Sequence, residues 1–322
     1  MVAVAMAACD GTAGRPGGPG DAAPLGPVPA GSASAGGSAG ENPSMRQDLD
    51  VAYASQSPAQ RLDLYRPAPA ADGGPVPLVV LIHGGAFAFG DKGEMDVHVR
   101  ALVGHGYAVA SLNYRMVPEA TYPAAVDDVR AAVRWLRAGA PRLGLDAGRF
   151  AAFGESAGAY LAAMLGTSGD LPFPGDEALG NVDVPSAVRA VVDLYGPVDF
   201  PTMDGQLTAN PRCGAGAAVH DAAGSPESRF LGHQITTVPD LVRAASPATH
   251  LGAGRTPPRF LLEHGTADCT VPYQQSVAFA GALRAAGGAA DLRIVDGAGH
   301  GPDFPLADRL PGILAFLDDA LR

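Results

Sequence analysis

The chain alternates between short, continuous apolar runs and longer segments with helical periodicity. The apolar runs end at glycines or polar residues and read "VPLVVLIHGG", "YAVASLNYR", "RFAAFGES", "VRAVVDLYG", "PRFLLEHG" and "ADLRIVDG". Continuous runs of this length are typical of parallel strands that are buried on both faces. Helical patterns lie between them, at 95–105, 124–138, 157–165, 273–286 and 308–321. The alternation predicts an α/β fold, with a mostly parallel central sheet flanked by helices.

Two further segments and one irregular stretch complete this predicted domain. Residues 49–55 and 60–65 predict an antiparallel hairpin at the start of the sheet. Residues 200–251 have poor periodicity and frequent Gly, Pro and Ala, and they are inserted between two predicted strands. We expect them to form a small lid over the carboxyl ends of the strands. No second alternating series and no internal repeat follows, so we predict one domain over 45–322.

The N-terminal residues differ in composition from the rest of the chain. Residues 1–9 are apolar and end in two alanines and Cys9, and residues 10–44 are mostly Gly, Ala, Pro and Ser. The start resembles the end of a bacterial lipoprotein signal, although it lacks a basic n-region and about half of the usual apolar segment. The following segment is expected to be a disordered tether. These features predict a secreted protein or a lipoprotein anchored at Cys9, with a cytoplasmic protein as the alternative.

The other cysteines are Cys213 and Cys269. In an exported protein they can form a disulfide, which is rarely kept in the reducing cytosol. Closing a loop of that length would stabilise the fold by roughly 4 kcal/mol in the chain-entropy description. The alternative is a pair of buried free thiols.

Charge and composition exclude several classes of partner. The net charge of −11 would repel nucleic acids and anionic membrane surfaces. No apolar run approaches the roughly 20 residues that a membrane-spanning helix needs. His, Cys, Asp and Glu do not cluster at the spacing of a metal site. We therefore predict no nucleic-acid partner, no integral membrane segment, no metal and no organic cofactor, and leave the oligomeric state open.

The stretch "FGESAG" places Ser156 between a predicted strand and an alanine-rich helix. This is the strand–turn–helix context that a nucleophilic serine in a G-x-S-x-G motif requires. Side chains at Gly154 and Gly158 would clash with neighbouring backbone in so tight a turn. The start of the following helix would also favour negative charge on Ser156. We predict that Ser156 is a nucleophile, with a small residue in a glycine-rich turn as the alternative.

A serine hydroxyl needs a base to accept its proton, and the base needs a carboxylate to orient it. His300 lies in a glycine-rich loop after the last predicted strand, which suits the base. Asp268 lies just beyond the strand "RFLLE" and is the expected acid, with Asp199 as the alternative. The order Ser156, Asp268, His300 is the chain order of this strand–turn–helix class of site. His264 is expected to hydrogen-bond locally.

Acyl-transfer chemistry also needs hydrogen-bond donors for a developing oxyanion. In "IHGGAFAFGDK", Gly84 and Gly85 follow the first buried strand, and their N–H groups are candidate donors together with that of Ala157. The alternative is a tight glycine turn without this role. His83 is expected to be structural.

Four aromatic side chains are candidates for the border of a substrate pocket. Phe87 and Tyr273 are the main candidates, with Phe89 and Phe200 beside them, and core packing is the alternative for each.

Taken together, these pieces resemble an α/β-hydrolase esterase of the HGG-containing group, similar to the hormone-sensitive lipase-like and bifunctional acetyl/feruloyl esterase families. "YRMVPEATYPAAVDDVRAAVRWL" resembles a segment of that group, and "RAASPATHL" and "HGTADCTVPYQQS" resemble the bifunctional-esterase branch. The resemblance runs from about residue 48 to the end. Ala159 departs from it, because relatives usually carry glycine there, and Glu155 occupies the variable position of the motif.

The resemblance implies a serine hydrolase that cleaves carboxylic esters through an acyl-enzyme, without metal or cofactor. Small-molecule or polysaccharide-linked esters are the expected substrates, whether short-chain acyl, acetyl or feruloyl, and polyesters are a further option. Two other functions remain open. A serine peptidase of this fold would normally carry a propeller or a large cap, and a non-catalytic binding module would be expected to lose a residue of the triad.

Overall fold

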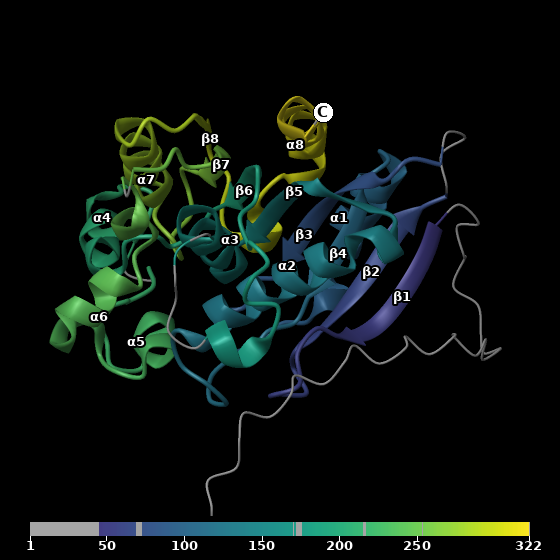
Figure 1. Cartoon of the computed structure of the whole chain (residues 1–322). Helices are drawn as coiled ribbons and strands as arrows, with labels where there is room; N and C mark the ends of the chain where they lie inside the picture. Colours follow the sequence, from purple (N-terminus) through teal and green to yellow (C-terminus); the bar gives the residue numbers. More distant parts are fainter. Residues whose placement is uncertain are drawn as a thin grey trace, which may run out of the picture. The chain divides into compact units, whose positions relative to one another are not determined.

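Figure 1 shows the computed structural model of the chain. It describes residues 45–68, 73–169, 171, 176–214, 217–252 and 254–321. The predicted signal at 1–9 with Cys9 and the predicted tether at 10–44 lie outside the described residues.

The described residues form one mixed sheet in the order β1-β2-β4-β3-β5-β6-β7-β8 (Figure 1). The strands are β1 Met45–Ala52, β2 Arg61–Pro67, β3 Val76–Ile82, β4 Ala108–Leu112, β5 Leu145–Glu155, β6 Ala190–Leu194, β7 Arg259–Gly265 and β8 Ala290–Val295. β2 pairs antiparallel with β1 and with β4, and the other neighbouring pairs are parallel. The predicted hairpin and the mostly parallel sheet are confirmed.

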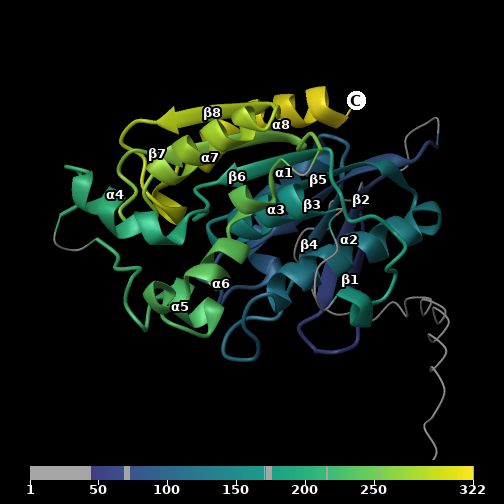
Figure 2. The same cartoon turned by 60° about the vertical axis from the view of Figure 1, so that its left-hand side comes forward.

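Helices cover both faces of this sheet (Figure 2). They are α1 Asp96–Gly104, α2 Ala124–Leu143, α3 Ala157–Ser168, α4 Met203–Ala209, α5 Pro226–Leu231, α6 Pro239–Ala244, α7 Gln274–Ala285 and α8 Leu306–Leu321. Short 3-10 turns lie at Lys92–Met95, Asp176–Leu179, Phe200–Thr202, Ile235–Thr237, Pro247–His250 and Gly301–Asp303. Apolar side chains of α2, α3 and α7 join one core, and those of α1 and α8 join the other.

The strands divide their side chains between these two cores. In β3, Leu78, Val80 and Ile82 lie in the core with α2 and α3, whereas Val79 and Leu81 lie in the core with α1 and α8. Successive strand residues point to opposite faces, so a strand that is covered twice must be apolar at every position. This is the physical origin of the continuous apolar runs in the sequence.

Some element boundaries differ from the predicted ones. α2 continues five residues beyond the predicted end at 138, to Leu143, although Pro141 lies inside it. A proline in the last turn costs one backbone hydrogen bond without stopping the helix. The helix then ends at Gly144, whose φ is 72°.

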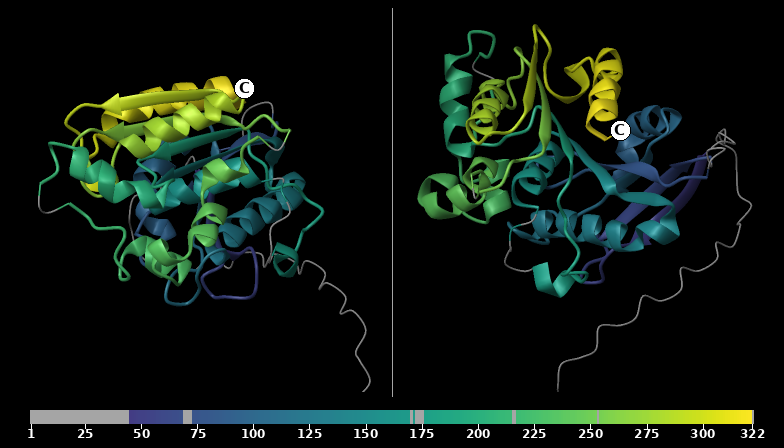
Figure 3. Two further views of the ribbon diagram at one scale, coloured as in Figure 1. Left: turned by 90° about the vertical axis from the view of Figure 1, so that its left-hand side faces the viewer. Right: turned by 45° about the horizontal axis from the view of Figure 1, so that its top comes forward.

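The insertion between β6 and β7 is more regular than the sequence indicated. It contains the short helices α4, α5 and α6, which lie together at one end of the sheet in Figure 3. Helices of six or seven residues complete fewer than two turns, so they leave little periodicity in a sequence. Phe200 and Phe230 of the insertion pack against Phe87 and Tyr160. The insertion therefore lies against the loop after β3 and against α3.

The junction of β5 and α3 is held by close backbone contacts. A Cβ atom at Gly158 would lie 2.1 Å from the carbonyl oxygen of Ile82, and one at Gly154 would lie 2.1 Å from that of Gly158. Real Cβ atoms do not approach oxygen so closely. The expected steric requirement for glycine at both positions is confirmed.

The variant Gly158→Ala should therefore lower the free energy of unfolding by about 1–3 kcal/mol or more, because β3 must move to admit the methyl group. Gly281→Ala is the matched control. Gly281 lies in α7 with open space around its Cα, so alanine there should raise stability by about 0.5–1 kcal/mol. Denaturant unfolding of both variants measures the difference. Equal stabilities would show that the contact at Gly158 is not limiting.

β6 carries a buried acid, Asp193, which is 1% exposed. One carboxylate oxygen accepts the N–H of Gly196 at 2.9 Å, and the other has no hydrogen-bond partner among the described residues. Burial raises the pKa of Asp193 to about 6, although Gly196 and His264 partly oppose the shift. The protonated form is therefore the one that the fold favours.

This raised pKa predicts that stability falls as the pH rises. Below about pH 4 the Asp193 carboxyl is protonated in both the folded and the unfolded chain, and its contribution to the free energy of unfolding is fully present. Between pH 4 and 6 it ionises more readily in the unfolded chain, so the free energy of unfolding should fall by about 3 kcal/mol. Asp193→Asn should remove this component, so that the variant gains stability relative to wild type between pH 4 and 7. Unfolding across that range tests it, with the exposed Asp183→Asn as control, and a pH-independent difference would contradict it.

Candidate active site

Ser156 occupies the sharp turn between β5 and α3. Its backbone has φ 53° and ψ −120°, a left-handed conformation that side chains rarely adopt. The Ser156 N–H donates to the carbonyl of Leu194 on β6 at 2.9 Å, and its own carbonyl accepts the N–H of Tyr160. These bonds and the glycine contacts hold the strained turn in place, so that Oγ lies at the carboxyl edge of the sheet.

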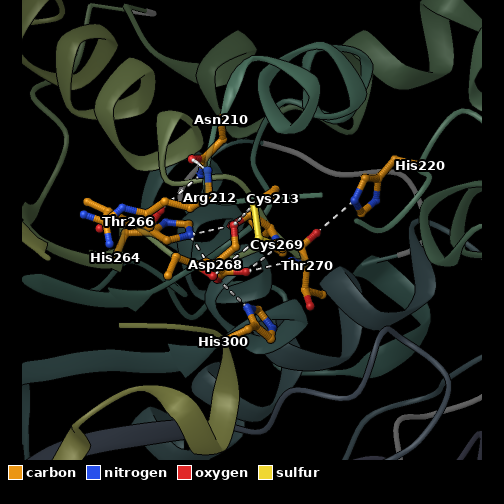
Figure 4. The surroundings of a disulfide bond; sticks show 12 residues. Asn210, Arg212, Cys213, His220, His264, Thr266, Asp268, Cys269, Thr270 and His300 are labelled. Carbon is orange, nitrogen blue, oxygen red and sulfur yellow. Dashed lines mark hydrogen bonds and ion pairs between the residues drawn. A yellow bond between two sulfur atoms is a disulfide. The ribbon is translucent and has the colours of Figure 1, made fainter. Parts of the chain in front are cut away.

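The structure brings Ser156, His300 and Asp268 together from three loops. His300 follows β8, and its Nε2 lies 2.9 Å from the Ser156 Oγ. Its Nδ1 lies 2.6 Å from the Oδ2 of Asp268, which follows β7 (Figure 4). Because a carboxylate accepts, Nδ1 carries the proton, and Nε2 is then free to accept the serine O–H. Residues 144 positions apart in sequence thus form one hydrogen-bonded chain.

The Asp268 carboxylate is fully buried and has several donors. Its Oδ1 accepts the N–H groups of Thr270 and Val271 at 2.9 and 2.8 Å. Burial by itself would raise the pKa of Asp268, but hydrogen bonds from His264 and His300 outweigh it and hold the pKa well below its usual value. Asp268 therefore remains ionised beside the imidazole of His300.

His264 is a neighbour of this carboxylate that the sequence reading did not assign to the site. Its Nε2 lies 2.9 Å from the Val271 carbonyl and 3.2 Å from Asp268 Oδ2, both of which are acceptors. Nε2 must therefore carry a proton, while Nδ1 accepts the Ser276 hydroxyl at 2.8 Å. The expected local hydrogen bonds are present. The contact of His264 with Asp268 could have been suggested by their separation of only four residues in the sequence.

Asp199, the alternative acid, lies elsewhere. Its carboxylate accepts the Thr202 hydroxyl at 3.1 Å, and its backbone groups bond to Gln275. The hydrogen bond to His300 is made by Asp268.

Tyr195 supports the other side of the base and was also missed. It follows β6 with φ 49°, and its ring centroid lies 4.7 Å from that of His300. Burial, followed by the neighbouring Glu155 carboxylate, raises the pKa of Tyr195, so its phenol stays protonated and bonds to Glu155. Glu155 also lies 3.0 Å from His98. The sequence signal for Tyr195 was its place directly after a predicted parallel strand, at the carboxyl edge of the sheet.

The loop after β3 lies against the serine turn. A Cβ atom at Gly84 would lie 3.3 Å from the Ser156 Cβ, and Gly85 adopts φ 112°. Ala157 is the first residue of α3, so its N–H has no carbonyl partner within the helix. His83 lies behind this loop, where it stacks on Tyr114 and donates to the Gly84 carbonyl at 2.7 Å. Burial lowers the pKa of His83, in keeping with a neutral, structural side chain.

The predicted substrate-facing role of Phe87 needs correction. Phe87 is 1% exposed and stacks on Phe230 with ring centroids 4.1 Å apart. Its neighbour in that cluster, Phe200, is also buried. Core packing, the alternative to a place at the pocket border, therefore describes both Phe87 and Phe200. Phe89 differs, because it is 65% exposed and its ring lies beside Gly85. Tyr273 is half-buried at the start of α7.

A disulfide joins Cys213 of the insertion to Cys269, the residue after Asp268 (Figure 4). The Cα atoms are 5.3 Å apart. Near it, the buried His220 lies 2.9 Å from the buried Glu227. Burial opposes a charge on His220, but Glu227 outweighs this effect and raises its pKa.

The described residues contain neither a metal-binding group nor a membrane-spanning helix. No group of three or more His, Cys, Asp or Glu side chains in that part of the chain has the arrangement to hold a metal ion. No helix there has both the length and the apolar character that crossing a membrane would require.

Comparisons with known proteins identify the family of the chain. The BD-FAE family model matches residues 62–283, more than half of the chain. Esterase LipC of Mycobacterium tuberculosis is 29% identical over 257 residues, which cover 77% of this chain and 58% of LipC. The chain thus spans little more than half of that relative.

Among solved structures, a truncated carbohydrate esterase from gut microbiota is 29% identical, with a TM-score of 0.75. The match covers 87% of this chain and 98% of that one. A bifunctional GH43-CE protein of Bacteroides eggerthii is 30% identical, with a TM-score of 0.73 over 86% of this chain and 38% of that one. By its family match and its architecture, the chain belongs to the BD-FAE family and has the α/β-hydrolase fold.

Proposed function

We propose that the protein is a serine esterase that hydrolyses carboxylic esters through an acyl-enzyme. The observation that carries the proposal is the chain of hydrogen bonds from Ser156 Oγ to His300 Nε2 at 2.9 Å and from His300 Nδ1 to Asp268 Oδ2 at 2.6 Å. A serine hydroxyl with this base and acid is equipped for nucleophilic attack. The esterase names of the relatives support the same reaction.

In the first half of the proposed reaction, Ser156 Oγ attacks the ester carbonyl while His300 Nε2 takes its proton. The ionised Asp268 stabilises the imidazolium that forms. We assign the stabilisation of negative charge on the former carbonyl oxygen to the N–H groups of Gly84, Gly85 and Ala157. The contact of Gly84 with the serine turn and the position of Ala157 directly after Ser156 support this assignment. His300 then returns the proton to the leaving alcohol, and an ester of Ser156 remains.

In the second half, His300 takes a proton from water, and the resulting hydroxide attacks the acyl group on Ser156. Collapse of the tetrahedral intermediate releases the acid, and the proton returns to Ser156 Oγ. The chain's own residues supply each proton transfer.

For the substrate, we propose short-chain acyl esters or esters carried by carbohydrates, with acetyl and feruloyl esters as the two leading groups among the latter. Two structural neighbours are named as a carbohydrate esterase and as a bifunctional protein, which supports a carbohydrate-linked ester. The exposed ring of Phe89 beside Gly85 suits contact with a sugar or an aryl group, and Tyr273 is a second candidate contact.

We also propose that the protein works outside the reducing cytosol, either secreted or anchored through Cys9. The disulfide between Cys213 and Cys269 supports this location. The anchor itself rests on the sequence of residues 1–9 alone.

Replacement of the reacting groups tests the function. Ser156→Ala should lower kcat for p-nitrophenyl acetate by a factor on the order of 10⁴–10⁶, and Asp268→Asn by about 10⁴, because His300 then loses its orienting acceptor. Ser55→Ala, at an exposed serine, and Asp199→Asn should stay within about threefold of wild type. If wild type and Ser156→Ala both hydrolysed p-nitrophenyl acetate only at the rate of the uncatalysed reaction, a non-catalytic binding module would be favoured instead.

A substrate panel tests the proposed ester class. We expect cleavage of acetyl-xylan and methyl ferulate, with activity falling as the acyl chain of p-nitrophenyl esters lengthens. Phe89→Ala should raise KM for methyl ferulate by about 3–10-fold, because a stacked ring contact is worth about 1 kcal/mol. Val219→Ala, at another exposed apolar residue, is the matched control. Cleavage of an amide with no cleavage of any ester would overturn the esterase assignment and favour a peptidase.

A further inference from the structure

We propose that Asn210, Cys213, Ala218 and His220 of the insertion clamp the loop that carries Asp268, and that the Cys213–Cys269 disulfide makes the hydrolase activity dependent on its redox state. This inference rests on the proposed function. Here the bridge acts as a positioning element for the acid, in addition to stabilising the fold.

The covalent contact lies directly beside the acid. Cys269 follows Asp268 in sequence, and its sulfur is bonded to Cys213 of the insertion, 56 positions away. The Cys213 sulfur also lies 3.6 Å from the Asp268 carbonyl oxygen. Figure 4 shows the bridge on one side of Asp268 and His300 on the other. Any movement of the insertion is therefore transmitted to the backbone of the acid itself.

Hydrogen bonds hold the same loop at three more places. The Asn210 side chain donates to the Thr266 carbonyl at 3.1 Å, and the Ala218 N–H donates to the Cys269 carbonyl at 3.1 Å. His220 Nε2 donates to the Thr270 carbonyl at 2.9 Å. The clamp residues thus contact the loop before, at and after the bridge.

The contact at Thr270 leads directly to the carboxylate. The carbonyl of Thr270 is held by His220, and its N–H donates to Asp268 Oδ1 at 2.9 Å. His220 is fixed in turn, because Glu227 lies 2.9 Å from its other ring nitrogen and Asp204 accepts its backbone N–H at 2.7 Å. The orientation of the carboxylate therefore depends on groups in the insertion.

The clamp also reaches the loop that carries the base. Arg212, next to Cys213, lies 2.8 Å from Asp296, four residues before His300. Asp296 accepts the Thr266 hydroxyl at 2.9 Å, and that hydroxyl accepts the Gly297 N–H. The insertion is thus linked both to the loop that carries the acid and to the loop that carries the base.

Opening the bridge is chemically simple. A thiolate of a dithiol attacks one sulfur, and the Sγ–Sγ bond breaks as a mixed disulfide forms; the second thiol of the reagent then releases it. Two electrons and two protons pass to the protein, which keeps two thiols, and the dithiol is oxidised to its cyclic disulfide. Both cysteines are half-buried, so the sulfurs are within reach of a small reagent.

The test compares oxidised wild type, wild type reduced with dithiothreitol, and the double variant Cys213→Ser with Cys269→Ser. We expect kcat for p-nitrophenyl acetate to fall by about 10–100-fold in both unbridged forms, because displacement of a catalytic group by about 1 Å costs about 10²-fold. KM should stay within about threefold, since the clamp contacts the acid and not the ester. Reoxidation should restore the reduced wild type, and dithiothreitol should not change the double variant.

Leu102→Ala separates this effect from general loss of stability. Leu102 is fully buried in the core with α1 and α8, on the sheet face opposite α3, so its truncation should destabilise the fold without touching the clamp. At temperatures where circular dichroism shows each form folded, Leu102→Ala should keep the kcat of wild type. Equal losses in Leu102→Ala and in the unbridged forms would overturn the positioning role.

Labelling of Ser156 by a fluorophosphonate gives a readout that needs no natural substrate. The labelling rate should fall with kcat when the bridge is opened. Equal labelling of folded oxidised and reduced protein would overturn the clamp while leaving the serine hydrolase intact. Oxidised wild type that is never labelled would contradict the serine-hydrolase proposal itself, and the clamp would then have no reaction to act on.

Discussion

A buried, ionised carboxylate at Asp268 sets the requirements that the rest of the site meets. A charge with no solvent contact is stable only when donors surround it. Here two backbone N–H groups and two imidazoles supply those donors. The loop after β7 must therefore turn back on itself, His264 must point inward from the strand, and the loop after β8 must deliver His300 to the same place. The position of His300 thus follows from the hydrogen-bond donors that the buried Asp268 carboxylate requires.

The sheet makes this convergence possible. Parallel strands present their carboxyl ends at one edge, so the loops after β3, β5, β7 and β8 meet without long connections. At the centre, Gly154 and Gly158 let β3, β5 and α3 approach more closely than side chains would allow. The strain at Ser156 is then maintained by the sheet itself, through the bond from Ser156 to Leu194 on β6. The close packing of β3, β5 and α3 thus fixes the position of Ser156 at the edge of the sheet.

The insertion between β6 and β7 serves both halves of the site. Through Phe200 and Phe230 it packs on Phe87, which lies in the loop that carries two of the candidate oxyanion donors. Through Cys213 and His220 it contacts the loop of the acid. It also contributes Arg212, which contacts the loop of the base. This segment of short helices, which has little periodicity in its sequence, therefore contacts the loops after β3, β7 and β8.

Outside the insertion, the sequence by itself determined the alternation of strands and helices along the chain and the two covered faces of the sheet. It also determined the glycines of the serine turn and the candidate serine, histidine and aspartate. These follow from local patterns, because a doubly buried strand must be apolar throughout and a tight turn excludes Cβ atoms. Only the tertiary structure decided that Asp268 and not Asp199 contacts His300, that Phe87 is buried while Phe89 is exposed, and that His264, Tyr195 and His220 support the site. Those outcomes depend on which loops face one another across the sheet edge, and distances between loops far apart in the chain leave no periodic trace in the sequence.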